Sequence, residues 1–388
     1  RLRLLLGSAG ILAPVLLTPA ADQGRRSHIA ALTGLRAVAA LLVVGTHAAF
    51  VTGKLNHGYL GAMAARLEIG VAIFFALSGF LLFRPWVTAA AAGSDAPSAA
   101  RYAHRRLRRV MPAYLATVLL AYGVYSVFSS GPNPGQSLAG LLRHLTLTQI
   151  YTDNYLMTHL HRGLSQTWSL AVEVAFYAVL PLLAYLLVVV LCGDRWRPAR
   201  LLAGLAGLAA ISLGWQVVLV TTDWLPNSAG MWLPAHLASF AVGMGLAVLA
   251  EAGVRCPATV TLPLAFGAFL LVSTPVAGAV AMGPVRVWEP LIKTVLYAAV
   301  AALAVAAAGL DDRGLADLVL ASRPMVWLGE ISYEIFLLHV LVMAVVLGEV
   351  LRWPLFTGSM AGLFAATLAV TLPLAWLLRR LTARIYLA

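Results

Sequence analysis

LTGLRAVAALLVVGTHAAF, residues Leu32–Phe50, is an apolar stretch long enough to cross a bilayer, yet it contains two ionisable side chains. Arg36 lies near its start and His47 in its second half. Eleven residues make about three helical turns, so the two side chains share one helix face and lie ~16 Å apart. Ionisable side chains are costly in hydrocarbon, and each is therefore a candidate functional residue.

The composition indicates a polytopic membrane protein. Of 388 residues, 61% are hydrophobic and 11% are charged, whereas soluble domains carry about 25% charged residues. We expect an all-α bundle of transmembrane helices in contact with membrane lipid. The net charge of +12 could suggest nucleic acid, but it is better explained by arginines that set membrane orientation, and no nucleic-acid partner is expected.

Ten apolar segments have the roughly 20-residue length that a bilayer core requires. They lie at 32–51, 69–88, 110–128, 167–191, 201–221, 233–251, 259–279, 291–309, 325–347 and 358–378. We therefore divide the chain into a cytoplasmic or interfacial segment, 1–31, and a transmembrane domain, 32–388. Within the first segment, residues 1–21 are apolar but broken by Gly and Pro. They could be a tail, an interfacial segment or an eleventh span.

The positive charges predict the orientation. With the N-terminus inside, 20 of the 27 Lys and Arg side chains fall on inner segments and seven on outer ones. Inner loops carry the excess of Lys and Arg in membrane proteins. We expect both termini in the cytoplasm and the protein in a bacterial inner membrane. The outer connection 129–166 could cover one face of the bundle.

Counting residues from the inner ends of the spans places His47, Glu173 and His339 in one layer, about 21 Å from the inner face. A carboxylate beside a neutral histidine orients the ring, and the second ring nitrogen can then take a proton from a hydroxyl. The layer could instead be a buried Glu–His contact that holds helices together, and His339 could simply bond a neighbouring helix.

A basic stretch, YAHRRLRRVMP, precedes the third span. Arg105 and Arg109 are four residues apart and share a helix face, with Arg106 beside them. Guanidinium groups suit phosphate, although inner arginines also contact lipid headgroups. The outer His159 and His161 lack further ligands at metal-site spacing, and no metal site is expected.

Five stretches in order resemble the membrane acyltransferase 3 family. They are Leu32–His47, VAIFFALSGFLL at Val71–Leu82, YAHRRLRRVMPAY at Tyr102–Tyr114, QTWSLAVEVAFY at Gln166–Tyr177, and GEISYEIFLLH at Gly329–His339. The resemblance covers about residues 30–345. It implies an integral membrane enzyme that moves an acyl group from cytoplasmic acyl-CoA to a hydroxyl on the outer side.

The resemblance also implies roles for individual residues. His47 matches the family's essential histidine, and Glu173 then becomes its expected partner. Arg36, with the basic loop, would hold the CoA phosphates. The remaining matched positions are expected to support or bind substrate, and Gly79 would permit close helix approach; the supporting set is Ser78, Trp168, Ser169, Tyr177, Tyr333 and His339. Thr33 stands where the family often has Asp, so a role for an acid there is in doubt.

Several alternatives stay open at this stage. His47 could act as a general base or carry the acyl group itself. Acetyl-CoA is the expected donor substrate, with no permanently bound cofactor, and the expected acceptor is an envelope glycan or glycolipid, with a secondary metabolite as an alternative. Buried His, Glu and Arg would also suit a proton-coupled transporter or flippase, although no inverted repeat is visible.

Overall fold

The computed structural model describes residues 20–129, 131–280, 286–310 and 314–387. Residues 1–19 of the expected N-terminal segment 1–31 lie outside the described residues. The three alternatives for residues 1–21 therefore stay predictions. The described residues form helices and no strand. In chain order the helices are α1 (Ala20–Val51), η1 (Lys54–Asn56), α2 (Gly58–Arg66), α3 (Ile69–Ala92), α4 (Ala99–Tyr125), α5 (Leu138–Leu145), α6 (Tyr155–Thr158), α7 (Thr167–Ala184), η2 (Tyr185–Leu191), α8 (Pro198–Thr221), η3 (Asn227–Met231), α9 (Leu233–Glu251), α10 (Ala258–Val272), η4 (Pro275–Ala277), α11 (Trp288–Gly309), α12 (Leu315–Leu320), α13 (Arg323–Glu330), α14 (Ser332–Val345), η5 (Val346–Leu351) and α15 (Met360–Leu387).

The expected all-α membrane bundle is confirmed. Within the described residues, eight helical segments are long and apolar enough to cross a membrane. Two of the ten expected spans are not among those eight. One is α10, which is apolar but only 15 residues long, and the other is α4, whose first half contains the arginines of the basic stretch.

One expected span is broken. The stretch 325–347 forms α13 and α14, which meet at Ile331. Just before this break, the backbone of α13 lies very close to that of α1. A Cβ atom added to Gly329 would lie 1.8 Å from the carbonyl oxygen of Thr33. The backbone of α1 therefore packs directly on the end of α13, and a side chain larger than hydrogen has no room there.

Helices α3 and α9 also pack backbone to backbone. A Cβ on Gly79 would meet the carbonyl oxygen of Phe240 at 2.2 Å, and one on Gly243 would meet that of Ala76 at 1.9 Å. The paired glycines let the two backbones touch, as small residues do between membrane helices. The close approach expected at Gly79 is confirmed, and it fixes the position of α3 along the bundle.

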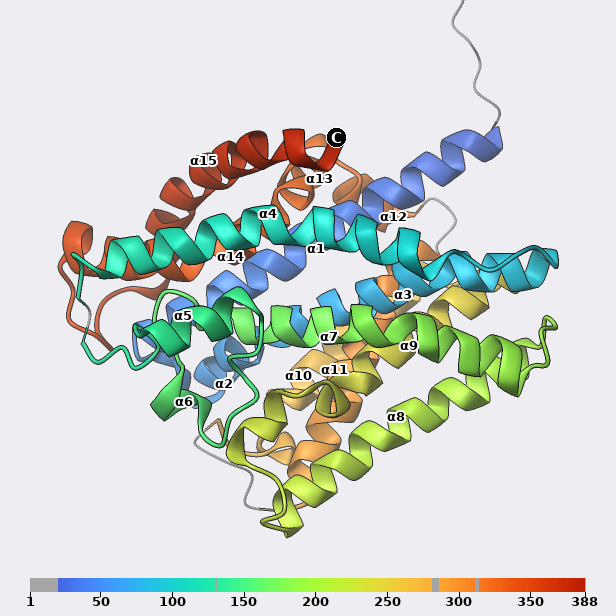
Figure 1. The fold of residues 1–388 in the computed structure, drawn as a ribbon, viewed down its shortest axis with the longest axis horizontal. Helices are drawn as coiled ribbons and strands as arrows, with labels where there is room; N and C mark the ends of the chain where they lie inside the picture. Colours follow the sequence, from blue (N-terminus) through green and yellow to red (C-terminus); the bar gives the residue numbers. More distant parts are fainter. Residues whose placement is uncertain (1–19, 130, 281–285, 311–313, 388) are drawn as a thin grey trace, which may run out of the picture.

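Figure 1 shows how the remaining helices surround this pair. Helices α4 and α7 run along the long axis, and α1 crosses them obliquely. The short helices α5 and α6, from the connection 129–166, lie at one end of the bundle (Figure 1). His144 and His161 from this connection are fully buried, so the segment is a packed cap over that end.

Candidate active site

Two histidines meet between α1 and α14. His339 Nε2 lies 3.3 Å from His47 Nδ1, and the ring centroids are 5.0 Å apart. His339 Nδ1 is 2.8 Å from the carbonyl oxygen of Phe336, and His47 Nδ1 is 2.8 Å from that of Val43. These histidines were expected at one depth, and the structure brings them into contact.

The carbonyl contacts assign the ring protons. Each Nδ1 faces a backbone carbonyl of its own helix, which can only accept, so each Nδ1 carries a proton; when the rings are neutral, each Nε2 has the lone pair. His339 Nε2 then carries a lone pair toward the Nδ1–H of His47. His47 Nε2 makes no hydrogen bond among the described residues, and its lone pair is available to accept a proton.

A cavity of about 280 Å³ lies beside the histidines, enclosed by α1, α3, α4, α7 and α14. Most of the residues singled out in the sequence line it. They are Arg36, Ser78, Arg106, Arg109, Ser169, Glu173, Tyr177 and Tyr333. Phe74 and Phe336 close one wall with rings 6.5 Å apart, and the Phe336 ring lies 6.2 Å from that of His339. The histidine pair is therefore directly behind this aromatic wall.

Three guanidinium groups face one carboxylate in this cavity. Arg36 interacts electrostatically with Arg106, Arg109 and Glu173, and it makes no hydrogen bond or ion pair in the described part of the chain. Arg106 Nε is buried and also has no hydrogen-bond partner there. Buried guanidinium groups normally have partners, so the cavity holds an excess of positive charge that suits an anionic ligand.

Glu173 is held inside this cavity. Its Oε1 accepts hydrogen bonds from the hydroxyl groups of Ser78 and of Tyr177, the latter at 2.7 Å. Ser78 and Tyr177 were expected only as supporting residues, and the structure gives them this definite role. A carboxylate with two hydroxyl donors has a fixed orientation.

Two expectations are corrected. Glu173 was expected to partner His47, but its contacts are those in the arginine cavity, and His47 contacts His339 instead. A shared depth does not set lateral contacts, and α1 crosses the bundle obliquely (Figure 1). Arg105 was expected to share a face with Arg109 toward the ligand. It is exposed and does not line the cavity, because α4 turns Arg106 and Arg109, three residues apart, toward it.

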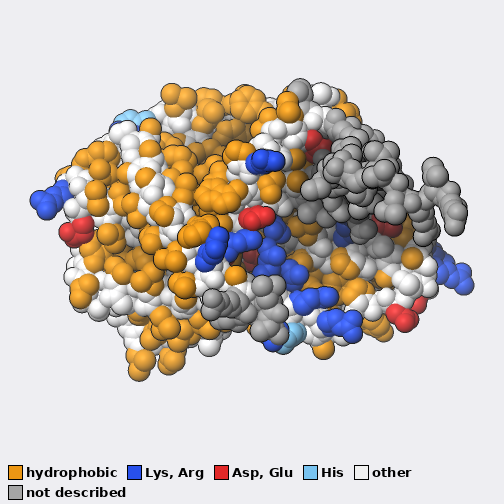
Figure 2. All heavy atoms as spheres, turned by 90° about the horizontal axis from the view of Figure 1, so that it is seen from above, with side chains coloured by type: hydrophobic (Ala, Val, Ile, Leu, Met, Phe, Trp, Pro, Cys, Tyr) orange, Lys and Arg blue, Asp and Glu red, His pale blue; other side chains and the backbone are white. Residues whose placement is uncertain are grey.

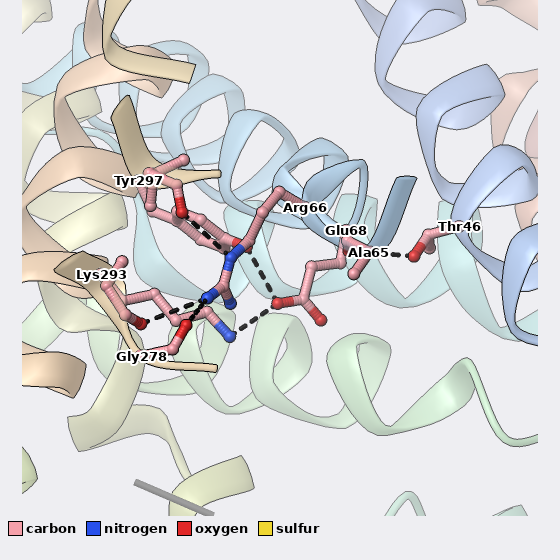
Figure 3. A network of polar contacts seen from close by, with 9 residues as sticks. Thr46, Ala65, Arg66, Glu68, Gly278, Lys293 and Tyr297 are labelled. Atoms are coloured by element: carbon pink, nitrogen blue, oxygen red, sulfur yellow. Dashed lines mark hydrogen bonds and ion pairs between the residues drawn. The ribbon is translucent and has the colours of Figure 1, made fainter. Parts of the chain in front are cut away.

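A second polar network lies near the part of α1 that carries His47, where the Thr46 hydroxyl donates to the carbonyl of Ala65. Its carboxylate is Glu68, which the sequence analysis did not single out. Lys293 Nζ lies 2.6 Å from Glu68 Oε1, and the Tyr297 hydroxyl donates to the same oxygen at 2.9 Å. Figure 3 shows this network with Arg66 at its centre. A lysine inside the apolar stretch 291–309 was the sequence signal that could have revealed it.

Trp168 lies on the other side of α7 from the arginines. Its ring is 5.3 Å from that of His236, which in turn lies 5.4 Å from Phe75. His236 interacts electrostatically with Glu68 and Lys293. Trp168 thus packs on His236 and does not line the cavity.

The surface around the site is largely hydrophobic. Figure 2 views the molecule from above, and its Lys and Arg side chains gather on one half of a face that is otherwise mostly apolar. Exposed Leu107, Leu119 and Leu120 on α4 contribute to the apolar area. A face of this kind suits contact with lipid, with charged groups kept toward one end.

Comparison with known proteins identifies the family. Residues 29–380 match the sequence model of the acyltransferase domain family Acyl_transf_3, so the chain belongs to this family and is a multi-pass membrane acyltransferase. The chain is 30% identical over 373 residues to the acyltransferase MdmB of Streptomyces mycarofaciens, covering 89% of this chain and 88% of that protein.

A second relative is the peptidoglycan O-acetyltransferase OatA of Listeria monocytogenes. It is 29% identical over 214 residues, which are 52% of this chain and 31% of OatA. No solved structure matches the chain. Membership of an acyltransferase family favours the enzyme over the transporter that the buried charges also suggested.

Proposed function

We propose that this member of the acyltransferase family moves an acyl group, with acetyl-CoA as donor, to a hydroxyl of an envelope glycan or glycolipid. The donor binds from the cytoplasm and the acceptor from the outer side of a bacterial inner membrane, with both chain termini inside. The observation that carries the proposal is the cavity, which is lined by guanidinium groups that form no ion pair with the described residues and has a histidine pair behind its aromatic wall.

The charge of the cavity supports an acyl-CoA donor. The phosphates of CoA are anionic, and Arg36, Arg106 and Arg109 are three guanidinium groups with one carboxylate among them. Arginine binds phosphate bidentately. Arg36 and His47 are ~16 Å apart along α1, so a donor held by Arg36 can extend its thioester along the helix toward His47.

The histidine pair supports the chemical step. His47 Nε2 takes the proton from the acceptor hydroxyl as its oxygen bonds to the thioester carbonyl carbon. The carbon–sulfur bond then breaks, and the CoA thiolate takes up that proton. His339 holds the Nδ1 side of His47, so the basic nitrogen keeps one direction. In the alternative route Nε2 first bonds to the acyl carbon while the carbon–sulfur bond breaks and CoA leaves as the thiolate. The acceptor hydroxyl oxygen then bonds to the acyl carbon, the bond from that carbon to Nε2 breaks, and the hydroxyl proton goes to the thiolate.

The direct experiment measures both half-reactions of purified protein in vesicles. Wild type should release CoA from acetyl-CoA and transfer radiolabelled acetyl to a glycolipid extract from membranes of the source organism. His47→Ala should lower transfer at least about a hundredfold, because it removes the base, while acetyl-CoA still binds. Val340→Ala on the neighbouring helix is the control. Transfer by His47→Ala at the wild-type rate would remove His47 from the mechanism.

A further inference from the structure

The Glu68 network has a side that its protein contacts do not use. Arg66 is 5% exposed and donates three hydrogen bonds: Nε to the carbonyl of Val272 at 3.1 Å, and Nη2 to those of Ala277 and Gly278 at 3.2 and 2.8 Å. Glu68 differs, because only its Oε1 accepts bonds (Figure 3). Its Oε2 has no hydrogen bond or ion pair among the described residues.

The ion pair is also open to a ligand. The side chains of Lys293 and Glu68 are 35% and 44% accessible. The Lys293 ammonium has three N–H donors, and its one ion pair in the described chain is with Glu68. A pair that served only to join α3 to α11 would need neither this access nor the spare donors and acceptor.

The open side lies next to His47. The Thr46 hydroxyl donates to the carbonyl of Ala65 at 3.1 Å, and a Cβ on Gly45 would lie 3.1 Å from Leu67 Cδ1. Helix α1 therefore packs at the level of His47 on the residues that precede Glu68. Glu68 follows Leu67 directly in the chain, so a molecule held by its carboxylate lies near the part of α1 that carries His47.

An aromatic group completes the surroundings. Glu68 and Lys293 also interact electrostatically with His236, whose ring packs on the partly accessible Trp168. His236 Nε2 is buried and has no hydrogen-bond partner among the described residues. Spare polar groups beside an indole ring suit a ring-shaped ligand that carries several hydroxyl groups.

We infer that Glu68 and Lys293 bind the acceptor, and that the acceptor is a sugar held through hydroxyl groups next to the one that is acylated. Glu68 Oε2 accepts from one neighbouring hydroxyl, and the Lys293 ammonium donates to the oxygen of another. The sugar then presents its remaining hydroxyl to His47 Nε2. Glu68 and Lys293 are positioning residues, and this assignment rests on the proposed acyl transfer.

The test separates acceptor binding from donor chemistry. Wild type, Glu68→Gln and Lys293→Met are compared in vesicles with radiolabelled acetyl-CoA and the membrane glycolipid extract at increasing concentration. CoA release without extract and the Kd for acetyl-CoA are measured beside it. Glu68→Gln keeps the side-chain shape and an oxygen for the Tyr297 hydroxyl. Glu330→Gln is the matched control, because it removes an exposed ion pair with Arg379 elsewhere.

In Glu68→Gln and in Lys293→Met, the concentration of glycolipid extract that gives half-maximal transfer should rise about tenfold or more. This is the loss of affinity expected when a hydrogen bond to a charged group is removed. The maximal rate, CoA release and the Kd for acetyl-CoA should stay within about twofold of wild type. If the variants need no more extract than wild type, or if they lose transfer and acetyl-CoA binding together, Glu68 and Lys293 do not bind the acceptor. Neither result contradicts the proposed acyl transfer. Absence of both CoA release and transfer in wild type overturns the proposed function, and the inference with it.

Discussion

Arg36 and Arg66 are both arginines at membrane depth, and their surroundings differ completely. Arg66 donates to three backbone carbonyls at the ends of α10 and η4. Arg36 lies in a cavity with two other guanidinium groups and makes no hydrogen bond or ion pair among the described residues. A buried guanidinium that donates to several backbone carbonyls holds a fold together, whereas one that donates to no protein group is available to a ligand. The comparison therefore predicts opposite consequences for the same substitution at the two positions.

Arg36→Met should have the largest effect, and on binding alone. Loss of a buried guanidinium that contacts phosphate should raise the Kd for acetyl-CoA about a hundredfold, as measured by calorimetry. The temperature of unfolding in detergent should not fall, because no protein hydrogen bond is lost. Arg105→Met is the control, since this exposed side chain lies outside the cavity, and its Kd should match wild type. A large drop in stability of Arg36→Met would make the residue structural.

Arg66→Met should show the reverse. It leaves the carbonyls of Val272, Ala277 and Gly278 without their donor, at a cost of about 2 to 3 kcal/mol. The unfolding temperature should fall by several degrees, and the folded variant should bind acetyl-CoA with the wild-type Kd. Weaker acetyl-CoA binding by Arg66→Met that is still folded would show that Arg66 contributes to the donor site. The contrast between Arg36 and Arg66 would then be wrong.

The segment 129–166, which covers one end of the bundle, contains buried histidines. We expect a smaller effect on stability when these histidines take up protons. His161 Nε2 lies 2.6 Å from the Gln136 side-chain oxygen, and its Nδ1 accepts from the Gly163 N–H. Burial lowers the pKa of His161 to about 3 and that of His144 to about 4. Their neutral forms are thus part of the folded state.

Acid should therefore loosen this segment. Unfolded histidines have a pKa of about 6.5, so below that pH the unfolded state takes up protons that the folded state refuses. The contribution of each histidine to the free energy of unfolding should be fully present above about pH 7 and should be about 1 kcal/mol smaller at pH 6. Thermal unfolding between pH 7.5 and 6 measures this loss. His161→Gln should reduce the pH dependence, and an unchanged slope would show that other groups titrate.

Much of the site could be predicted because its residues belong to motifs. Arg36, Arg106, Arg109, Ser78, Glu173 and Tyr177 were singled out from the sequence, and all line one cavity. His47 and His339 were expected in one layer and are in contact. The errors concern partners. The rotation of α4 about its axis decides whether Arg105 or Arg106 faces the cavity. Helix periodicity in the sequence does not set this rotation, because either arginine could lie on the basic face.

Hydropathy and the distribution of arginine determined, without any coordinates, that this chain is an all-α membrane bundle with ionisable groups in its spans. Burial of apolar helices in lipid depends only on composition and length. Tertiary structure alone decided that Glu173 lies with the arginines, that Glu68 pairs with Lys293 and that His47 contacts His339. Helix tilt and the glycine contacts at Gly79, Gly243 and Gly329 set how far each helix slides past its neighbour. A slide of a few ångströms changes which carboxylate meets which histidine, and this displacement has no signature in a single sequence.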